Sequence, residues 1–570
     1  MFFPKLTTPA QNRVTISHFL GYDRRNGGEL GCFEEMENLT SDGFPALTVR
    51  KKRGALTSLI RPSGLTSKDC LIWVDGNTLY INGEATEPVL RSGEKQLVGM
   101  GAYLLIWPDK IYINTCDLSD WGHLENIVST TGTTTMWLCR GDGTMWQDYV
   151  TADTAPKDGK LWLDTSAIPC VLKQADDNGW VIVDDVCVMI SATGIGTGFS
   201  AGDGVTIKDC KEESLNGCFV LQAVGADYLV VQGMIEGVNT QSTPITVRRT
   251  VPEMDFVVES GNRLWGCKYG MVNGETVNEI YASKLGDFKN WNCFAGLSTD
   301  SYVASRGSDG VFTGAAACLG SVLFFKENCM ERVYPNPAGA HEIVTFACNG
   351  VQKGSHRSLA AVDGTLYYQS ICGICAFDGS LPVCVSQALG EQRYSRAVAG
   401  GYEGKYYVSM QDENGAYHLF VYDTRRKLWH REDNLQVRYF TQCDGELYAL
   451  AADGNVWSMR GVGGTKENVF PWIAESGELG LNNPENEYLE RLQLCLRLEE
   501  NAEVCAFISY DEGATWQAQG RIMGQQGRVN ECLMHIRPKR CSHFRLKLQG
   551  SGACTLYSIS AVYEKGSDGP

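Results

Sequence analysis

The chain has 570 residues and a formal net charge of −17 at pH 7, from 50 Lys and Arg against 67 Asp and Glu. This acidic balance argues against a generic nucleic-acid-binding surface, which needs clustered basic side chains. The length allows three or four domains with a large buried core. No apolar run is long enough for a membrane-spanning helix, so we expect no membrane-spanning segment.

The first residues, MFFPKLTTPAQNR, lack the basic and apolar regions of a secretory signal, so none is predicted. The 22 cysteines are scattered singly along the chain. Several fall inside apolar strand patterns, which favours reduced, buried thiols over a disulfide framework.

Residues 1–55 are expected to be mostly irregular, and the basic run Arg50–Arg53 is interpreted as a solvated segment. Two similar hairpins follow. The first is LIWVDGNTLYIN at Leu71–Asn82 and the second is LLIWPDKIYIN at Leu104–Asn114. Both contain the tripeptides LIW and YIN, and turn-forming residues separate their strands.

Residues 126–250 interrupt the series of similar hairpins with short β-rich segments that have no helical periodicity. They predict a small β-barrel or β-sandwich inserted between the repeated units. The glycine run Gly194–Gly198 is not a dinucleotide-binding fingerprint, because its spacing differs and no amphipathic helix follows.

After Val251 a glycine followed by an aromatic-rich strand recurs at Gly261, Gly320, Gly364, Gly404 and Gly445. The clearest unit, residues 404–459, contains Asn-Gly and Asp-Gly pairs between alternating strands, a strong hairpin signal. The last three glycines recur roughly every 40 residues, the size of a propeller blade. About seven such units predict a β-propeller, with a series of stacked sandwiches as the alternative.

From residue 466 the pattern changes to alternating apolar and charged residues, as in YLERLQLCLRL at Tyr488–Leu498, which predicts a β-sandwich. The predicted fold class is therefore all-β: a β-propeller interrupted by an inserted β-barrel or sandwich domain and followed by a C-terminal β-sandwich. The predicted boundaries are 1–125 for the N-terminal segment and first blades, 126–250 for the insertion, 251–465 for the remaining blades and 466–570 for the sandwich.

The sharpest short motif is SYDEGATW at Ser509–Trp516, which matches the Asp-box of sialidase-type propellers. It predicts a structural turn in which Asp511 caps backbone amides, Gly513 adopts a positive φ and Trp516 packs beneath, with Ser509 and Thr515 completing the motif. Sialidases also need an arginine cluster and a tyrosine nucleophile, and neither is visible as a local motif.

Cys532, His535, Cys541 and His543 have the ligand types for zinc and form a weak candidate site. The CxxC spacing of Cys372 and Cys375 lacks a second ligand pair, so these residues are interpreted as part of a turn and a strand. Six other histidines, including His418 and His430, are isolated in the sequence. We therefore predict no catalytic residues, no cofactor and no metal beyond that weak zinc candidate.

Four sequence segments, taken in chain order, together resemble one protein family. They are MENLTSDGFPALTVR (Met36–Arg50), RLWG with EIYASKLGDFKNW (Arg263–Gly266 and Glu279–Trp291), LFFKENCMERVYP (Leu323–Pro335) and SLAAVDGTLYYQSICGICAFDG (Ser358–Gly379). Together they resemble the β-propeller nozzle or hub proteins of short-tailed bacteriophages, also called tail tubular or stabilisation proteins.

The resemblance implies a virion structural protein made in the host cytoplasm and carried in the phage tail. Members of such families commonly assemble as six copies into a ring below the portal and adaptor, contact tail fibre or needle proteins, and let viral DNA pass without specific binding. An acidic lining would repel phosphate during that passage. This reading predicts a protein that is not an enzyme; the alternative is a tail protein that binds or cleaves host glycans in a sialidase-like manner.

Overall fold

The computed structural model of the chain describes residues 11–25, 31–177, 179–294, 296–336, 340–479, 487–524, 529–535, 540–541 and 543–565. Its regular structure is almost entirely β, which confirms the predicted fold class. The chain divides into two compact units, one of Met1–Ala85, Phe325–Met330 and Phe346–Pro570, the other of Thr86–Phe324 and Glu331–Thr345. Among the described residues, no helix is long and apolar enough to cross a membrane.

Seven sheets in succession form the blades of the propeller. The first three contain β8 (Pro62–Lys68), β9 (Cys70–Asp75), β10 (Thr78–Ile81) and β11 (Glu84–Val89); β12 (Gln96–Met100), β13 (Tyr103–Trp107), β14 (Ile111–Asn114) and β15 (Trp121–His123); and β28 (Phe256–Ser260), β29 (Arg263–Val272), β30 (Glu275–Ala282) and β31 (Tyr302–Ser305). The fourth and fifth contain β32 (Gly314–Cys318), β33 (Ser321–Lys326), β34 (Cys329–Pro335) and β35 (His341–Ala347); and β36 (Ala360–Val362), β37 (Thr365–Ser370), β38 (Gly373–Phe377) and β39 (Val383–Cys384).

The last two blades are the ones in which the sequence repeat is clearest. They contain β40 (Tyr394–Tyr402), β41 (Lys405–Asp412), β42 (Tyr417–Asp423) and β43 (Leu428–Arg431); and β44 (Val437–Cys443), β45 (Glu446–Ala451) and β46 (Asn455–Ser458). The turn between β44 and β45 has φ of 47° at Asp444 and 71° at Gly445, as expected for an Asp-Gly hairpin turn. The sixth sheet also contains two short N-terminal strands, β2 (Gly21–Tyr22) and β3 (Cys32–Phe33).

An N-terminal strand completes the seventh blade. β7 (Gly54–Ser58) pairs antiparallel with β46, and the short β47 (Thr465–Lys466) pairs with β7 on its other side. Pairing the start of the propeller with its last blade covers an edge that would otherwise stay open.

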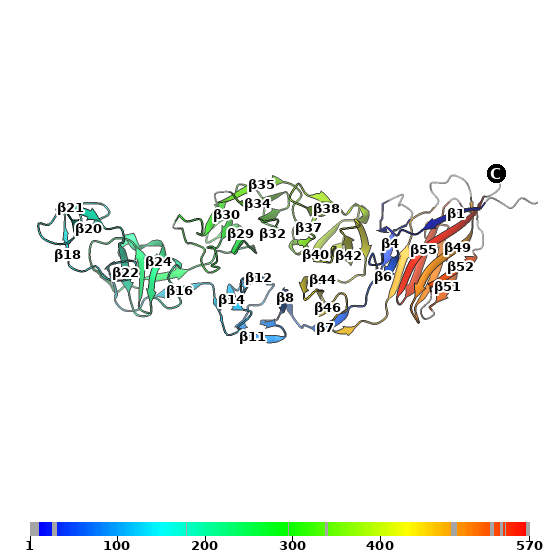
Figure 1. Cartoon of the computed structure of the whole chain (residues 1–570), viewed down its shortest axis with the longest axis horizontal. Coiled ribbons are helices and arrows are strands. Elements are labelled where there is room, and N and C mark those ends of the chain that lie inside the picture. Colours follow the sequence, from blue (N-terminus) through cyan, green and yellow to red (C-terminus); the bar gives the residue numbers. More distant parts are fainter. Residues whose placement is uncertain are drawn as a thin grey trace, which may run out of the picture. The chain divides into compact units, whose positions relative to one another are not determined.

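The C-terminal sandwich has two sheets, and each contains an N-terminal strand (Figure 1). One sheet contains β1 (Gln11–Ile16), β5 (Leu39–Thr40), β6 (Leu47–Val49), β49 (Glu487–Leu498), β52 (Val529–His535), β53 (Arg540–Cys541) and β55 (Cys554–Lys565). The other contains β4 (Glu35–Glu37), β48 (Pro471–Glu475), β50 (Glu503–Ser509), β51 (Gln517–Met523) and β54 (Arg545–Ser551). Residues 1–55 were expected to be mostly irregular, but half of the described residues in this segment lie in strands. The partners of β1, β4 and β7 lie hundreds of residues away, so the local sequence did not reveal these strands.

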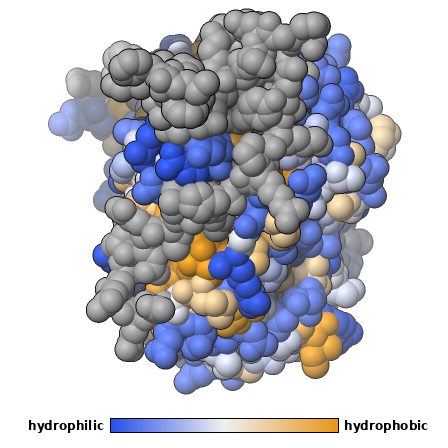
Figure 2. All heavy atoms as spheres, turned by 90° about the vertical axis from the view of Figure 1, so that its right-hand side faces the viewer, coloured by the Kyte–Doolittle hydropathy of each residue, from blue (hydrophilic) through white to orange (hydrophobic). Residues whose placement is uncertain are grey.

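The sandwich and the sixth blade share one hydrophobic core. It contains Leu492, Leu494 and Leu496 of β49, whose alternation turns every second side chain inward, together with Phe420 and Trp429 of the blade. Figure 2 shows one face of the molecule, whose described surface is mainly hydrophilic with smaller apolar areas between.

Residues 126–249 form the interrupting β domain. Its main sheet contains β16 (Asn126–Ser129), β17 (Thr134–Cys139), β22 (Cys187–Ser191), β23 (Gly204–Lys208), β24 (Gly217–Gly225), β25 (Tyr228–Gln232), β26 (Asn239–Gln241) and β27 (Thr246–Arg249). A second, small sheet contains β18 (Tyr149–Ala152), β19 (Leu161–Asp164), β20 (Val171–Asp176) and β21 (Gly179–Ile182). The only helical elements among the described residues are three short 3-10 turns: η1 (Glu213–Leu215), η2 (His356–Ser358) and η3 (Gln387–Leu389).

Candidate ligand-binding cleft

The Asp-box residues lie in the hairpin between β50 and β51. The Asp511 carboxylate accepts hydrogen bonds from the Ser509 hydroxyl at 2.7 Å and from the Thr515 amide at 2.8 Å, and Gly513 has φ of 90°. Hydrogen bonds from Thr515 and Ser509 lower the pKa of Asp511 to about 2. The ammonium of Lys547 lies 3.9 Å from the centre of a Trp516 ring. The Asp511 carboxylate therefore binds donors of its own turn, which is the structural role that the motif predicts.

Most of the residues of the zinc candidate have side chains that the structure does not describe. The side chains of Cys532, His535 and Cys541 are not described, whereas His543 is. Within the described part of the chain, no group of three or more His, Cys, Asp or Glu residues is arranged to hold a metal ion.

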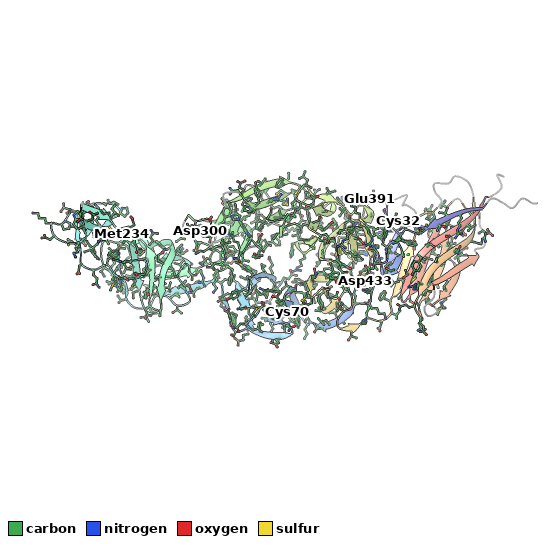
Figure 3. All side chains as sticks on the ribbon, viewed as in Figure 1. Cys32, Cys70, Met234, Asp300, Glu391 and Asp433 are labelled. Atoms are coloured by element: carbon green, nitrogen blue, oxygen red, sulfur yellow. The ribbon has the colours of Figure 1, made fainter. Side chains whose placement is uncertain are left out.

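A cleft of 960 Å³ lies where the fifth and sixth blades meet the segment that follows β2. A smaller pocket of 220 Å³ shares three of its residues, Arg24, Gln392 and Tyr394. Figure 3 labels two landmarks of this region, Glu391 on the cleft wall and Cys32 on β3. All of these residues belong to the first compact unit, so we treat the two hollows as one candidate site.

Arg24 lies at the junction of the two hollows. Its guanidinium donates to Gln392 Oε1 at 3.1 Å and to Glu35 Oε1 at 2.5 Å, and its backbone amide donates to Ala388 O at 2.8 Å. The preceding strand approaches β43 so closely that a Cβ on Gly21, which has φ of 83°, would lie 2.3 Å from Trp429 O. Glycine at that position therefore allows the segment carrying Arg24 to reach the cleft.

A chain of hydrogen bonds runs through the smaller pocket. The Tyr394 hydroxyl donates to Gln392 Oε1 at 3.2 Å, Gln392 Nε2 donates to Asp412 Oδ2 at 3.3 Å, and His418 Nε2 lies 3.0 Å from the same oxygen. The hydrogen bond from His418 is the main reason why the pKa of Asp412 is lowered. Asp412 Oδ1 accepts two amides of the Asn414-Gly415 turn, so the carboxylate is fixed in place.

Two tyrosines pack beside this chain against Phe420. The ring centres of Tyr22 and Tyr394 lie 5.6 Å and 5.4 Å from that of Phe420. Burial raises the pKa of Tyr394 to about 12 and raises that of Tyr22 as well. Both phenols are therefore protonated at neutral pH and can donate hydrogen bonds.

The charges around the site are mixed, with arginines in excess. Four arginines line the two hollows (Arg24, Arg25, Arg393 and Arg431), together with three carboxylates (Glu35, Glu391 and Asp412). Arg24 is paired with Glu35, and Arg25 with Asp23. Arg393 is exposed and pairs with no carboxylate among the described residues, so its guanidinium is available to a ligand.

No protein-family model matches the chain, and no curated protein does. Among solved structures, an exo-beta-1,3-galactanase from Phanerochaete chrysosporium is similar at 9% identity over 54% of this chain and 94% of that chain, with a TM-score of 0.21. A family 43 arabinoxylan arabinofuranohydrolase from Bacillus subtilis is similar at 8% over 54% and 95%, with a TM-score of 0.14. The phage phi92 endosialidase is similar at 9% over 78% and 64%, with a TM-score of 0.17. At this level of identity the likeness concerns the fold alone.

The prediction that the chain is not an enzyme is contradicted by this comparison, because the three similar structures named above are glycan-cleaving enzymes. That prediction relied on the lack of local catalytic motifs. In a propeller the groups around one hollow come from different blades and lie far apart in sequence, so missing local motifs do not exclude an active site.

The residues of the cleft were missed by sequence reasoning for the same reason. Arg24, Glu35 and Tyr394 come from three segments, and His418 was interpreted as isolated. One signal was present: the predicted Asn414-Gly415 turn pairs Met410 with His418, which brings His418 close to Asp412.

Proposed function

We propose that this chain is a bacteriophage tail protein that binds acidic host glycans in the cleft. The observation that carries the proposal is the grouping of four arginines, two tyrosines and three carboxylates around one pair of connected hollows. The tail assignment rests on the family resemblance of the sequence. The glycan assignment rests on the chemistry of the cleft.

Arginine suits the carboxylate of an acidic sugar because its planar guanidinium donates two parallel hydrogen bonds. Arg393 is free to do this, while Arg24 is oriented in advance by Gln392 and Glu35. The Tyr394 hydroxyl, whose proton is donated to Gln392 Oε1, can accept a hydrogen bond from a sugar hydroxyl, and its ring offers an apolar face.

The same site contains groups of the types that hydrolyse glycosides. Glycosidases generally use two carboxyl groups on either side of the scissile bond. Asp412 is ionised at neutral pH because its pKa is lowered, so its chemistry would be that of a base or nucleophile. Glu35, which also lines the smaller pocket, is the candidate for the second carboxyl group.

The test is a titration of the full chain with carboxylated and neutral oligosaccharides of matched length, followed by calorimetry, with released sugar measured in parallel. Replacing Arg393 by Gln should weaken binding of the acidic sugar by about tenfold or more, since a hydrogen bond to a charged group is worth about 1.5–3 kcal/mol. Arg497→Gln is the matched control, because Arg497 is an exposed arginine on β49, in the sandwich. Equal affinity for acidic and neutral sugars, or equal weakening by both variants, would refute the proposal.

A second candidate function is a subunit of a tail nozzle ring. The specific observation in its favour concerns the four sequence segments that resemble the nozzle family. They coincide with defined strands: β4 to β6, β29 and β30, β33 and β34, and β36 to β38. The net charge of −17 suits a channel wall past which DNA slides. Native mass spectrometry and negative-stain imaging test this candidate: a closed ring with an axial channel supports it, and a stable monomer refutes it.

A further inference from the structure

Two cysteines face each other across the edge of the fifth blade. Cys375 on β38 is directly opposite Cys384 on β39. The Val385 amide donates to Ile374 O at 2.8 Å, so the neighbouring pair is hydrogen-bonded and the two cysteines occupy a non-hydrogen-bonded position. Directly opposed residues at such positions have Cα atoms about 4.5 Å apart, which is within the range that a disulfide spans.

Both thiols lie on the same face of the sheet, next to Gly373. Cys384 Sγ lies 3.4 Å from the point where a Cβ on Gly373 would be. Cys375 Sγ lies 3.2 Å from the Ser370 hydroxyl, which itself donates to Gly373 O. Because Gly373 has no side chain, Cys384 Sγ and Ser386 Oγ can lie close to the place that its Cβ would take.

The two thiols differ in access. Cys384 is half-buried and lines the cleft, whereas Cys375 is only 2% exposed. An oxidant in solution therefore reaches Cys384 first, and Cys375 lies behind it as the resolving thiol. A third cysteine, Cys372, is exposed at the turn before β38.

We propose that Cys375 and Cys384 form a cross-strand disulfide when the protein meets a disulfide oxidant such as oxidised glutathione. The Cys384 thiolate attacks one glutathione sulfur and expels a glutathione thiolate. The Cys375 thiolate then attacks the Cys384 sulfur and expels the second glutathione, so two protein thiols are oxidised and one glutathione disulfide is reduced to two thiols. This chemistry needs no ligand in the cleft.

The chain provides an internal comparison. Cys139 and Cys187 are also directly opposite, on β17 and β22, but both are buried, with exposed fractions of 0% and 4%. The raised pKa values of these two thiols, caused mainly by burial, further reduce their reactivity. This pair is expected to stay reduced under conditions that oxidise Cys384. Burial also raises the pKa of Cys375 to about 11, so the closing step should accelerate as the pH rises.

The test is peptide mapping of the full chain after oxidation with glutathione disulfide at mildly alkaline pH and alkylation of the remaining thiols. Cleavage after Lys and Arg leaves Cys372, Cys375 and Cys384 in the single fragment 358–393, and a further cut before Asp378 separates Cys384 from the other two. The expected product links fragments 363–377 and 378–393, and reduction restores the two separate fragments.

Serine variants identify which cysteine is involved. The link should persist in Cys372→Ser and disappear in both Cys375→Ser and Cys384→Ser, while Cys139 and Cys187 are alkylated in every sample. A link that survives in Cys375→Ser would assign the bond to Cys372 and overturn the proposal. So would full alkylation of all three cysteines in the native protein, or a glutathione adduct on Cys384 that never resolves.

Discussion

The ion cluster formed by Arg53, Glu432 and Asp433 gives the sharpest stability prediction. Arg53, directly before β7, donates to Glu432 Oε2 at 2.6 Å and to Asp433 Oδ2 at 2.7 Å, and its side chain is only 3% exposed (Asp433 is labelled in Figure 3). Replacing Arg53 by Met leaves the buried Glu432 carboxylate and the partly exposed Asp433 carboxylate with only the longer contacts to Arg50, at 3.9 Å and 3.5 Å. Removing one partner of a buried pair costs about 3–5 kcal/mol. At about 2–4 °C per kcal/mol for a large domain, the melting temperature should fall by of order 10 °C.

Two comparisons test the physical reason. The exposed pair of Arg425 and Asp363 has a similar N–O distance of 2.9 Å but exposed fractions of 65% and 47%, so Arg425→Met should cost about 1 kcal/mol or less. Adding Glu432→Gln and Asp433→Asn to Arg53→Met should restore much of the lost stability, because the unpaired charges are then removed. Equal losses from Arg53→Met and Arg425→Met in thermal unfolding would refute the reasoning.

The pH dependence of the same cluster has a definite sign. Burial alone would raise the pKa of Asp433, but the charge of Arg53 outweighs it and the pKa is lowered in the folded state. A carboxyl group with a lowered folded pKa contributes stability above its unfolded pKa of 3.8 and loses it as the pH falls through the folded pKa. The difference between native protein and Arg53→Met should therefore be full at neutral pH and should shrink below about pH 4.

Three further predictions concern the sandwich and the cleft, each measured by thermal unfolding. Leu494→Ala should cost about 2–5 kcal/mol, since Leu494 is fully buried in the shared core; a cost below that of a surface substitution would contradict the packing. Asp511→Asn should lower the melting temperature at neutral pH, and the difference should vanish as the pH falls from about 4 toward the folded pKa of about 2; an unchanged difference at low pH would contradict the role of the carboxylate. Gly373→Ala should destabilise more than Gly364→Ala, because both have positive φ but only the first would place a Cβ 2.2 Å from Ser386 Oγ; equal losses would show that backbone strain alone matters.

The blades were predictable because their information is local. Strand alternation and the turn at Asp444-Gly445 are both encoded within a few residues, and one sheet closes within one repeat. The N-terminal strands were not, since pairing of β1 with β55 joins Gln11 to Glu564, and no periodicity in a six-residue segment specifies so distant a partner. The basic run Arg50–Arg53 shows the same limit. It was interpreted as solvated, yet Arg50 and Arg53 are buried in the structure, because the carboxylates that neutralise them come from the blade and from Glu467.

The candidate cleft combines these two kinds of information. Its Asp412–His418 contact is local, because one hairpin turn brings the two residues together, and so it could have been predicted from the turn. The position of Arg24 depends on residues far apart in the sequence. Arg24 reaches the same pocket because β2 is added to the sixth sheet, next to β43. A ligand that needs both groups therefore depends on the N-terminal segment being docked. Removing residues 1–25 should abolish binding of the acidic glycan even if the blade hairpins keep their own turns, whereas retained binding would show that the ligand does not need Arg24.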